Sequence, residues 1–265
     1  MNRLVEALLR RFGWQLSQPD PSPYEGLKAV PRYQETVVEL LGRDFTIPDS
    51  LSFYHSHREI FCDQIYRFTA DNPRPVILDG GSNCGTSIVY FKSLYPGARI
   101  TGVEADARIF EILSANIRAR HYEDVVLINK ALSTTREPVL FHREGADSGR
   151  VFPLEGGQAA PVEAVILDDL IHEPVDFLKM DIEGAETEVV CSSEKLDRVS
   201  NMFVEYHSFQ GAPQTLAALL QKLTACGFRY YIHRQFCSSR PLTEEKVRQG
   251  VDMQLNIFAR RMVSK

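Results

Sequence analysis

Polar side chains that could bind a small ligand and move a proton recur in this sequence directly after short apolar runs. These residues are Asp79, Asn83, Glu104, Asp181, Glu183, Glu205 and His207. Carboxylates accept hydrogen bonds from hydroxyl groups, and a histidine beside a carboxylate can take up a proton. Ligands of open α/β sheets bind outside the carboxyl ends of the strands, so these positions predict one ligand site if the runs are parallel strands.

The elements that must position these residues follow a regular pattern from residue 75 onward. Short apolar runs alternate with helical stretches near 85–95, 107–119, 184–191 and 213–226, which is typical of a mostly parallel sheet. The last two strands lack a full crossover between them, which predicts an antiparallel arrangement at the end of the sheet. The predicted fold class is therefore α/β, with a doubly wound, mixed, seven-stranded Rossmann-like sheet. Its strands are expected at 75–80, 99–105, 125–132, 175–182, 201–207, 228–234 and 253–261.

Residues 1–70 carry no such alternation and are predicted to form a helical N-terminal extension that covers the site. Within it, MNRLVEALLRRFGW has the apolar spacing of a short amphipathic helix. Residues 71–265 are predicted to form the ligand-binding domain.

The segment DGGSNCG, at 79–85, is the most informative stretch. Its glycines let the backbone turn sharply and approach a ligand, and the helix that begins near Gly85 offers free N–H groups. A dinucleotide fingerprint requires glycines at i, i+2 and i+5, but Ser82 stands at the second of these positions when counting starts from Gly80. An NAD-dependent oxidoreductase therefore stays only an alternative.

The pattern Asp-x-Gly-x-Asn-x-Gly in this segment resembles motif I of the class I S-adenosylmethionine-dependent methyltransferases. In this resemblance Glu104, one strand–helix unit later, accepts hydrogen bonds from both ribose hydroxyls, which suits a group with only acceptors. The resemblance implies a class I methyltransferase fold with S-adenosylmethionine as the cofactor. The implied cofactor-binding residues are Asp79, Gly81, Ser82, Asn83, Gly85, Glu104, Ala105, Asn129, Ala131 and Asp181.

The segment VDFLKMDIEGAETEVV, at 175–190, resembles the signature of the FkbM-type methyltransferases, as do LDDL at 167–170 and NKALS. The resemblance covers roughly residues 75–206. It implies an O-methyltransferase that acts on a hydroxyl of a small molecule, such as a sugar, a glycan or a polyketide-type natural product. A non-catalytic protein that only binds S-adenosylmethionine is a further alternative.

Three residues are candidates for catalysis, namely His207, Asp181 and Glu205. Residues two apart on a strand share a face, so Glu205 and His207 are expected to lie together near a strand end. We expect His207 to be the general base, with Asp181 as the second candidate. Asp181, Glu183 and Glu205 also offer oxygen ligands that suit Mg²⁺, but their spacing does not require a metal.

The composition of the sequence limits the kinds of partner that this protein is expected to bind. The formal net charge is −5 and no Lys/Arg tract stands out, which disfavours nucleic acid as a partner. No run of 18 apolar residues exists, so no membrane span is expected. The five cysteines are scattered and form no C-x-x-C pair, which favours reduced thiols and a cytoplasmic protein. The sequence leaves open a homodimer.

Overall fold

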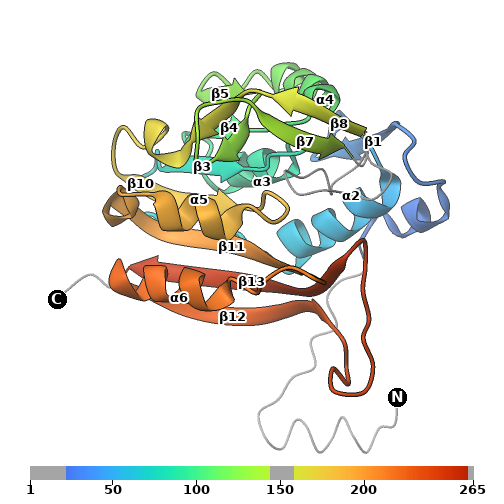
Figure 1. The fold of residues 1–265 in the computed structure, drawn as a ribbon. Coiled ribbons are helices and arrows are strands. Elements are labelled where there is room, and N and C mark those ends of the chain that lie inside the picture. The colour runs from blue at the N-terminus through green and yellow to red at the C-terminus, as the bar shows by residue number, and fades with distance from the viewer. Residues whose placement is uncertain (1–21, 144–157, 262–265) are drawn as a thin grey trace, which may run out of the picture.

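The computed structural model describes residues 22–143 and 158–261, and its centre is a seven-stranded sheet with helices on both faces (Figure 1). The strand order is β12-β13-β11-β10-β3-β4-β5, and β13 alone runs antiparallel to its neighbours within this described sheet. The predicted fold class, including the reversed strand near one edge, is confirmed. The strands are β3 (Val76–Gly80), β4 (Arg99–Val103), β5 (Val125–Ile128), β10 (Val175–Met180), β11 (Val199–Phe209), β12 (Phe228–Cys237) and β13 (Val251–Arg261).

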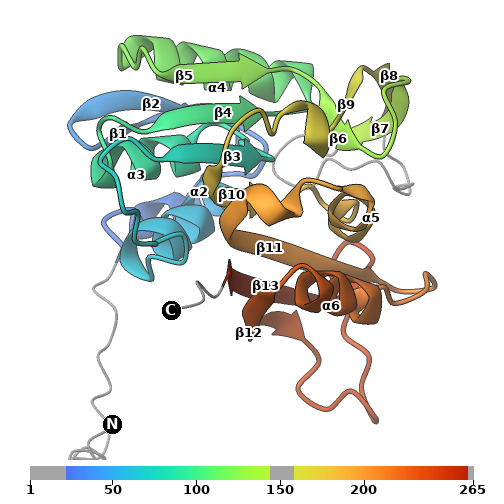
Figure 2. The same cartoon turned by 90° about the vertical axis from the view of Figure 1, so that its left-hand side faces the viewer.

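Alternating side chains of the central strands divide the core into two halves. Ile77 of β3 packs with the helices α3 (Thr86–Leu94) and α4 (Ala107–Ala119), whereas Leu78 packs with α5 (Glu186–Ser192) and α6 (Leu216–Ala225). Figure 2 shows α5 and α6 lying together on one side of the sheet. Because both faces of β3 are covered, its apolar run Val-Ile-Leu does not alternate with polar residues.

The N-terminal extension is only partly helical, which corrects the prediction for residues 1–70. Its described part contains a hairpin of β1 (Thr36–Leu40) and β2 (Arg43–Ile47). The two turn residues, Leu41 and Gly42, both have positive φ, of 51° and 74°, as a two-residue hairpin turn requires. The sequence Leu-Gly is not a usual signal for this turn, so the hairpin escaped prediction. The helix expected at the start of the chain lies outside the described residues.

After the hairpin, the chain forms the helical part of the extension. Helix α2 (Ser50–His57) begins at Asp49, whose carboxylate accepts a hydrogen bond from the Ser52 N–H. It continues into a π-helical turn, η2 (Arg58–Cys62). A 3-10 turn, η1 (Glu25–Ala29), precedes the hairpin.

The strand predicted at 125–132 is divided in the structure. It breaks at Asn129 and Lys130, and its second half becomes β6 (Ala131–Ser133), which pairs with β9 (Ala164–Ile166). Strand β7 (Val139–Arg143) pairs with β8 (Gln158–Val162) in a second small sheet. The break turns the backbone at Asn129 toward the preceding strand end. None of the described helices is both long enough and apolar enough to span a membrane.

Asn116 of α4 joins the hairpin to the central domain. Its buried amide accepts a hydrogen bond from the Thr46 N–H at 2.9 Å and donates to the Thr46 carbonyl at 2.8 Å and the Cys84 carbonyl at 2.9 Å. These three bonds attach both β2 and the glycine-rich loop to one side chain.

The substitution Asn116→Ala should lower the free energy of unfolding by about 2–4 kcal/mol, because it removes three hydrogen bonds and leaves buried backbone groups unsatisfied. Urea denaturation measures this change. Glu111→Ala, at an exposed position of the same helix, is the control and should stay within about 0.5 kcal/mol of the parent. A loss of less than about 0.5 kcal/mol in Asn116→Ala would contradict the role of Asn116.

Candidate functional site

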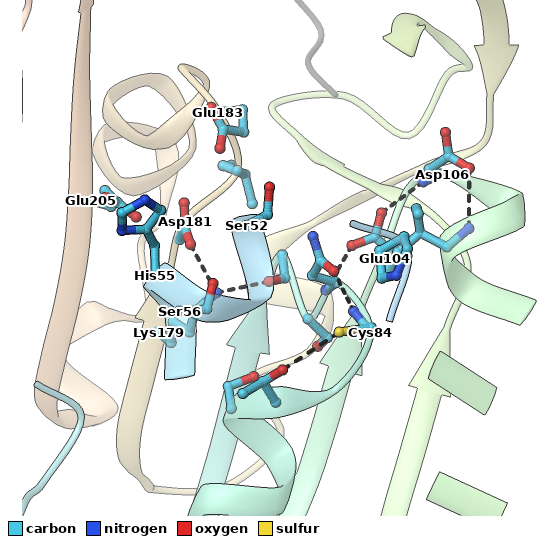
Figure 3. A pocket seen from close by; sticks show the side chains of 18 of the residues that line it. Ser52, His55, Ser56, Cys84, Glu104, Asp106, Lys179, Asp181, Glu183 and Glu205 are labelled. Carbon is cyan, nitrogen blue, oxygen red and sulfur yellow. Dashed lines mark hydrogen bonds and ion pairs between the residues drawn. The ribbon is translucent and has the colours of Figure 1, made fainter. Parts of the chain in front are cut away.

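A cavity of about 670 Å³ opens at the carboxyl ends of β3, β4, β10 and β11, as the order of the strands predicted. Helix α2 and the segments that flank the β12–β13 connection complete its wall. Such a volume is typical of sites for cofactors and small molecules. Figure 3 shows Glu104 and Asp106 at one end and Asp181, Glu183 and Glu205 at the other.

The glycine-rich loop forms the floor between these two ends. The Gly81 and Ser82 N–H groups both donate to the Val103 carbonyl, which holds the loop against β4. Gly81 has φ +77°, and a Cβ at this position would lie 1.7 Å from the Asp181 carbonyl oxygen. Only glycine fits here, because the loop backbone lies directly on the backbone that carries Asp181.

Glu104 occupies the position predicted for a ribose-binding acid. Its two oxygens accept hydrogen bonds from the Asn83 N–H at 2.9 Å and the Asp106 N–H at 2.8 Å. Each oxygen keeps a lone pair for a further donor. Burial raises the pKa of Glu104 to about 7, although the two backbone hydrogen bonds oppose this shift.

The wall beside Glu104 is apolar and suits a flat ring. Ala105 and Ala131 line it as predicted, and Leu132, Phe141 and Ile109 add apolar surface. Phe141 comes from β7, a strand that carries no motif, so the sequence offered no signal for its place in the site. Gly81, Ser82 and Asn83 also line the cavity.

Three residues predicted to contact the cofactor do not line the cavity, and they act behind its wall. Asp79 is completely buried, and its carboxylate accepts a hydrogen bond from the Ser87 hydroxyl at 2.6 Å. The Asn129 amide donates to the Glu104 and Ala105 carbonyls and so supports that strand end. Gly85, with φ +97°, allows the chain to enter α3 close to α4.

Lys179 connects the two ends of the cavity. Its ammonium donates to the Gly80 and Gly81 carbonyls at 3.1 and 2.8 Å, and it lies 3.4 Å from a carboxylate oxygen of both Asp79 and Asp181. Burial alone would lower the pKa of Lys179, but Asp181, Asp79 and Glu205 raise it above its ordinary value. The ammonium therefore stays charged and holds Asp181 beside the glycine-rich loop.

His207 lies in the cavity wall as predicted, but it is held by carboxylates on two sides. Its Nδ1 is 3.0 Å from Glu186 Oε1, and its Nε2 is 3.5 Å from Glu183 Oε2. Burial would lower the pKa of His207, but Glu183, Glu186 and Glu205 raise it well above the ordinary value. The Gln254 amide also lies 3.2 Å from Nε2, so both ring nitrogens already have partners, and the role of His207 as the general base stays a prediction.

Glu186, the buried acid beside His207, also accepts hydrogen bonds from the Ile182 and Gly184 N–H groups. It thereby fixes the turn that carries Glu183, whose φ is +59°. The sequence placed Glu186 in the first turn of a helix but gave no sign of this pairing.

Glu205 and Asp181 face the same part of the cavity. Burial raises the pKa of Glu205 well above its ordinary value, and the Asp181 charge raises it further. One donor atom each from Asp181, Glu205 and His207 lies within 4.8 Å of the others. The third member of this set is His207 instead of the Glu183 carboxylate that was expected with Asp181 and Glu205, and Mg²⁺ prefers oxygen ligands, so we derive no step through a metal.

Helix α2 and the following turn η2 contribute a group of residues that were not among the predicted site residues. Ser52, His55, Ser56 and Glu59 all line the cavity. Their spacing of three, four and seven residues is the one signal in the sequence that could have indicated a common face. A polar helical face ordinarily lies in solvent, so this signal does not distinguish a site from a surface.

The strand order, the glycine-rich turn after β3 and the acid after β4 together define a class I S-adenosylmethionine-dependent methyltransferase. Residues 79–230, more than half of the chain, match the family model of the methyltransferase FkbM domain. The chain belongs to this family, which confirms the resemblance inferred from the motifs.

Two relatives with assigned names are also methyltransferases. The chain is 26% identical to methyltransferase sdnD of Sordaria araneosa, over 65% of this chain and 85% of that protein. It is 24% identical to methyltransferase 1 of Beauveria bassiana, over 62% of this chain and 78% of that protein. These matches agree with the family assignment and do not favour the NAD-dependent alternative.

Similar solved structures include the methyltransferase FkbM from Methylobacillus flagellatus, with a TM-score of 0.49 and 14% identity, covering 78% of this chain and 50% of that one. Another is TYW2 of M. jannaschii in complex with AdoMet, with a TM-score of 0.49 and 12% identity, covering 88% of this chain and 89% of that one.

The affinity for S-adenosylhomocysteine should fall as the pH drops below about 7. In its predicted role Glu104 accepts hydrogen bonds from both ribose hydroxyls, which needs the ionised carboxylate. Because its pKa without ligand is about 7, the dissociation constant should rise toward tenfold per pH unit. Calorimetric titration between pH 5.5 and 8.5 measures this slope. Glu104→Gln should bind more weakly with little pH dependence, and an equal slope in this variant would rule out Glu104 as its source.

Proposed function

We propose that this protein transfers the methyl group of S-adenosylmethionine to a hydroxyl oxygen of a small molecule, such as a sugar, a glycan or a polyketide-type compound. The main observation behind the proposal is that the cavity has two chemically different ends. One end has the apolar wall and the acid of a nucleoside site, and the other is a chamber of polar and acidic side chains. Asp181 belongs to this second end, and Lys179 connects it to the glycine-rich loop.

This arrangement supports an in-line displacement. The methyl donor is already activated as a sulfonium, so the main task of the protein is to align the oxygen, the methyl carbon and the sulfur. Glu205 and Asp181 can accept hydrogen bonds from an acceptor hydroxyl and orient its oxygen. His207 contacts Glu183 and Glu186 and so holds both acids in place.

The proposed acceptor is a small molecule, with no role for nucleic acid. The formal net charge of −5 and a sequence in which no Lys/Arg tract stands out support this choice. We propose a cytoplasmic location from the scattered cysteines, and we keep a homodimer as a hypothesis that sedimentation can test.

Incubation with methyl-labelled S-adenosylmethionine and a panel of glycosides, hydroxylated polyketides and matched amines tests the proposal. Each acceptor is used with Mg²⁺ and, separately, with EDTA. A labelled ether formed from a hydroxyl acceptor supports the proposal. Transfer only to the amines contradicts it, and tight cofactor binding without transfer to any acceptor favours the non-catalytic alternative.

The substitution Asp181→Asn should lower kcat/KM by about 10²-fold on any acceptor found, because Lys179 then loses an anionic partner and the oxygen loses its alignment. Steady-state kinetics with the labelled cofactor measures the loss. Glu188→Gln, at an exposed position of α5, is the matched control and should retain the parent rate. A change of less than threefold in the kcat/KM of Asp181→Asn would show that Asp181 has no role in the reaction.

A further inference from the structure

Helix α2 turns a polar face toward the cavity, although the rest of the helix is embedded in the core. Ser52, His55, Ser56 and Glu59 line the cavity beside the apolar residues Leu51, Phe53 and Ile60, whereas Tyr54 and His57 are buried and do not line it. Figure 3 shows Ser52, His55 and Ser56 on this helix, in front of the glycine-rich loop. The polar face is therefore a wall of the acceptor chamber.

Glu59 lies at the end of this face, within the π-helical turn η2. The Asp63 N–H donates to the Arg58 carbonyl at 2.9 Å, five residues back, which widens the turn. Such turns often occur at functional sites. The Glu59 carboxylate also contacts the Gln235 amide of β12, so it is held between the N-terminal extension and the edge of the sheet.

Two of the other candidate bases in the chamber already have ionic or charged partners. His207 lies between Glu183 and Glu186, and Lys179 fixes Asp181. Glu205 and Glu59 each have a neutral amide as hydrogen-bond partner, Gln254 and Gln235, and neither forms an ion pair among the described residues. Glu205, however, lies directly beside Asp181 and His207, whereas Glu59 belongs to the separate wall formed by α2 and η2.

We propose that Glu59 is the catalytic base for the proposed O-methylation, on which this inference rests. The acceptor oxygen attacks the methyl carbon, and the carbon–sulfur bond breaks with its electron pair going to sulfur. The hydroxyl proton passes to the Glu59 carboxylate. A sulfonium, a carboxylate and an alcohol thereby become a thioether, a carboxylic acid and an ether, and the charges balance.

The electrostatics of the chamber agree with this role. Burial raises the pKa of Glu59 to about 7, and the nearby Asp181 and Asp63 charges raise it too, against the Gln235 hydrogen bond and Arg58. A general base works best with a pKa near the working pH. A sulfonium that enters beside these carboxylates favours their ionised forms, so the base is produced when the methyl donor binds. The titratable or charged groups that interact with Glu59 are Arg58, Asp63, Tyr66, Asp181 and Glu205.

Proton release on cofactor binding tests the proposal without any acceptor. Calorimetric titration at pH 7, in buffers of different ionisation enthalpy, counts the protons released by S-adenosylmethionine and by S-adenosylhomocysteine. Glu104 contributes equally with both ligands, whereas the sulfonium is present only in the first. The parent should release about 0.5 proton more with S-adenosylmethionine, as expected for a carboxyl half-protonated at pH 7.

Variants of the chamber and ribose-site acids show which residue causes this difference in proton release. Glu59→Gln should abolish it and keep the S-adenosylhomocysteine affinity within threefold of the parent, which shows that the variant is folded. Glu104→Gln should lower the release for both ligands and leave the difference intact. A difference that persists in Glu59→Gln but disappears in Glu205→Gln would overturn the assignment to Glu59.

Turnover gives the second test, on a hydroxyl acceptor identified with the parent enzyme. Glu59→Gln should lower kcat by about 10²–10⁴-fold and remove the loss of rate below pH 7, with the cofactor affinity unchanged. Equal activity of Glu59→Gln and the parent overturns the role of Glu59 alone. Failure of the parent on every hydroxyl acceptor overturns the proposed function instead, and with it the role of Glu59 as its base.

Discussion

The buried ammonium of Lys179 is the contact on which the rest of the site depends. Its side chain is 3% exposed, and it reaches two loop carbonyls and two carboxylates at once. A buried charge is costly unless it is paired and hydrogen-bonded, so these four partners must stay where they are. The glycine-rich loop after β3 and the end of β10 are therefore placed by the same atom.

This constraint explains why Asp79 faces the protein interior. An acid at the end of β3 could have turned toward a ligand, but it lies opposite Lys179 in the paired strand β10. The requirement for glycine at position 81 has the same origin, because the loop lies against the backbone of Asp181. The glycine-rich loop and Asp181 are thus held against each other by direct backbone contact and by Lys179.

The sequence predicted the parts of the fold and site that follow from strand ends. Glu104, Asp181, Glu205 and His207 lie at the expected edge of the sheet, because their positions depend only on strand order and period. The β1–β2 hairpin was missed, since its Leu-Gly turn lacks the usual residues. The contacts of His207 with Glu183 and Glu186 were also missed, because these two acids approach it only through a turn with positive φ at Glu183. Pairings of this kind depend on three-dimensional proximity, which the spacing of residues does not contain.

These contacts separate the part of the chain that forms the cofactor site from the parts that complete the acceptor chamber. The region that matches the FkbM family, residues 79–230, contains the glycine-rich loop, Glu104 and the Lys179 contacts to Asp181. The acceptor chamber is completed from outside this region, by α2 on one side and by Gln235, Arg248 and Gln254 on the other. Side chains within the matched region are fixed by the buried charges that they share, so they cannot change without disturbing the cofactor site. The flanking segments are free of that restriction, which makes them the part of the chain best suited to determine which acceptor is methylated.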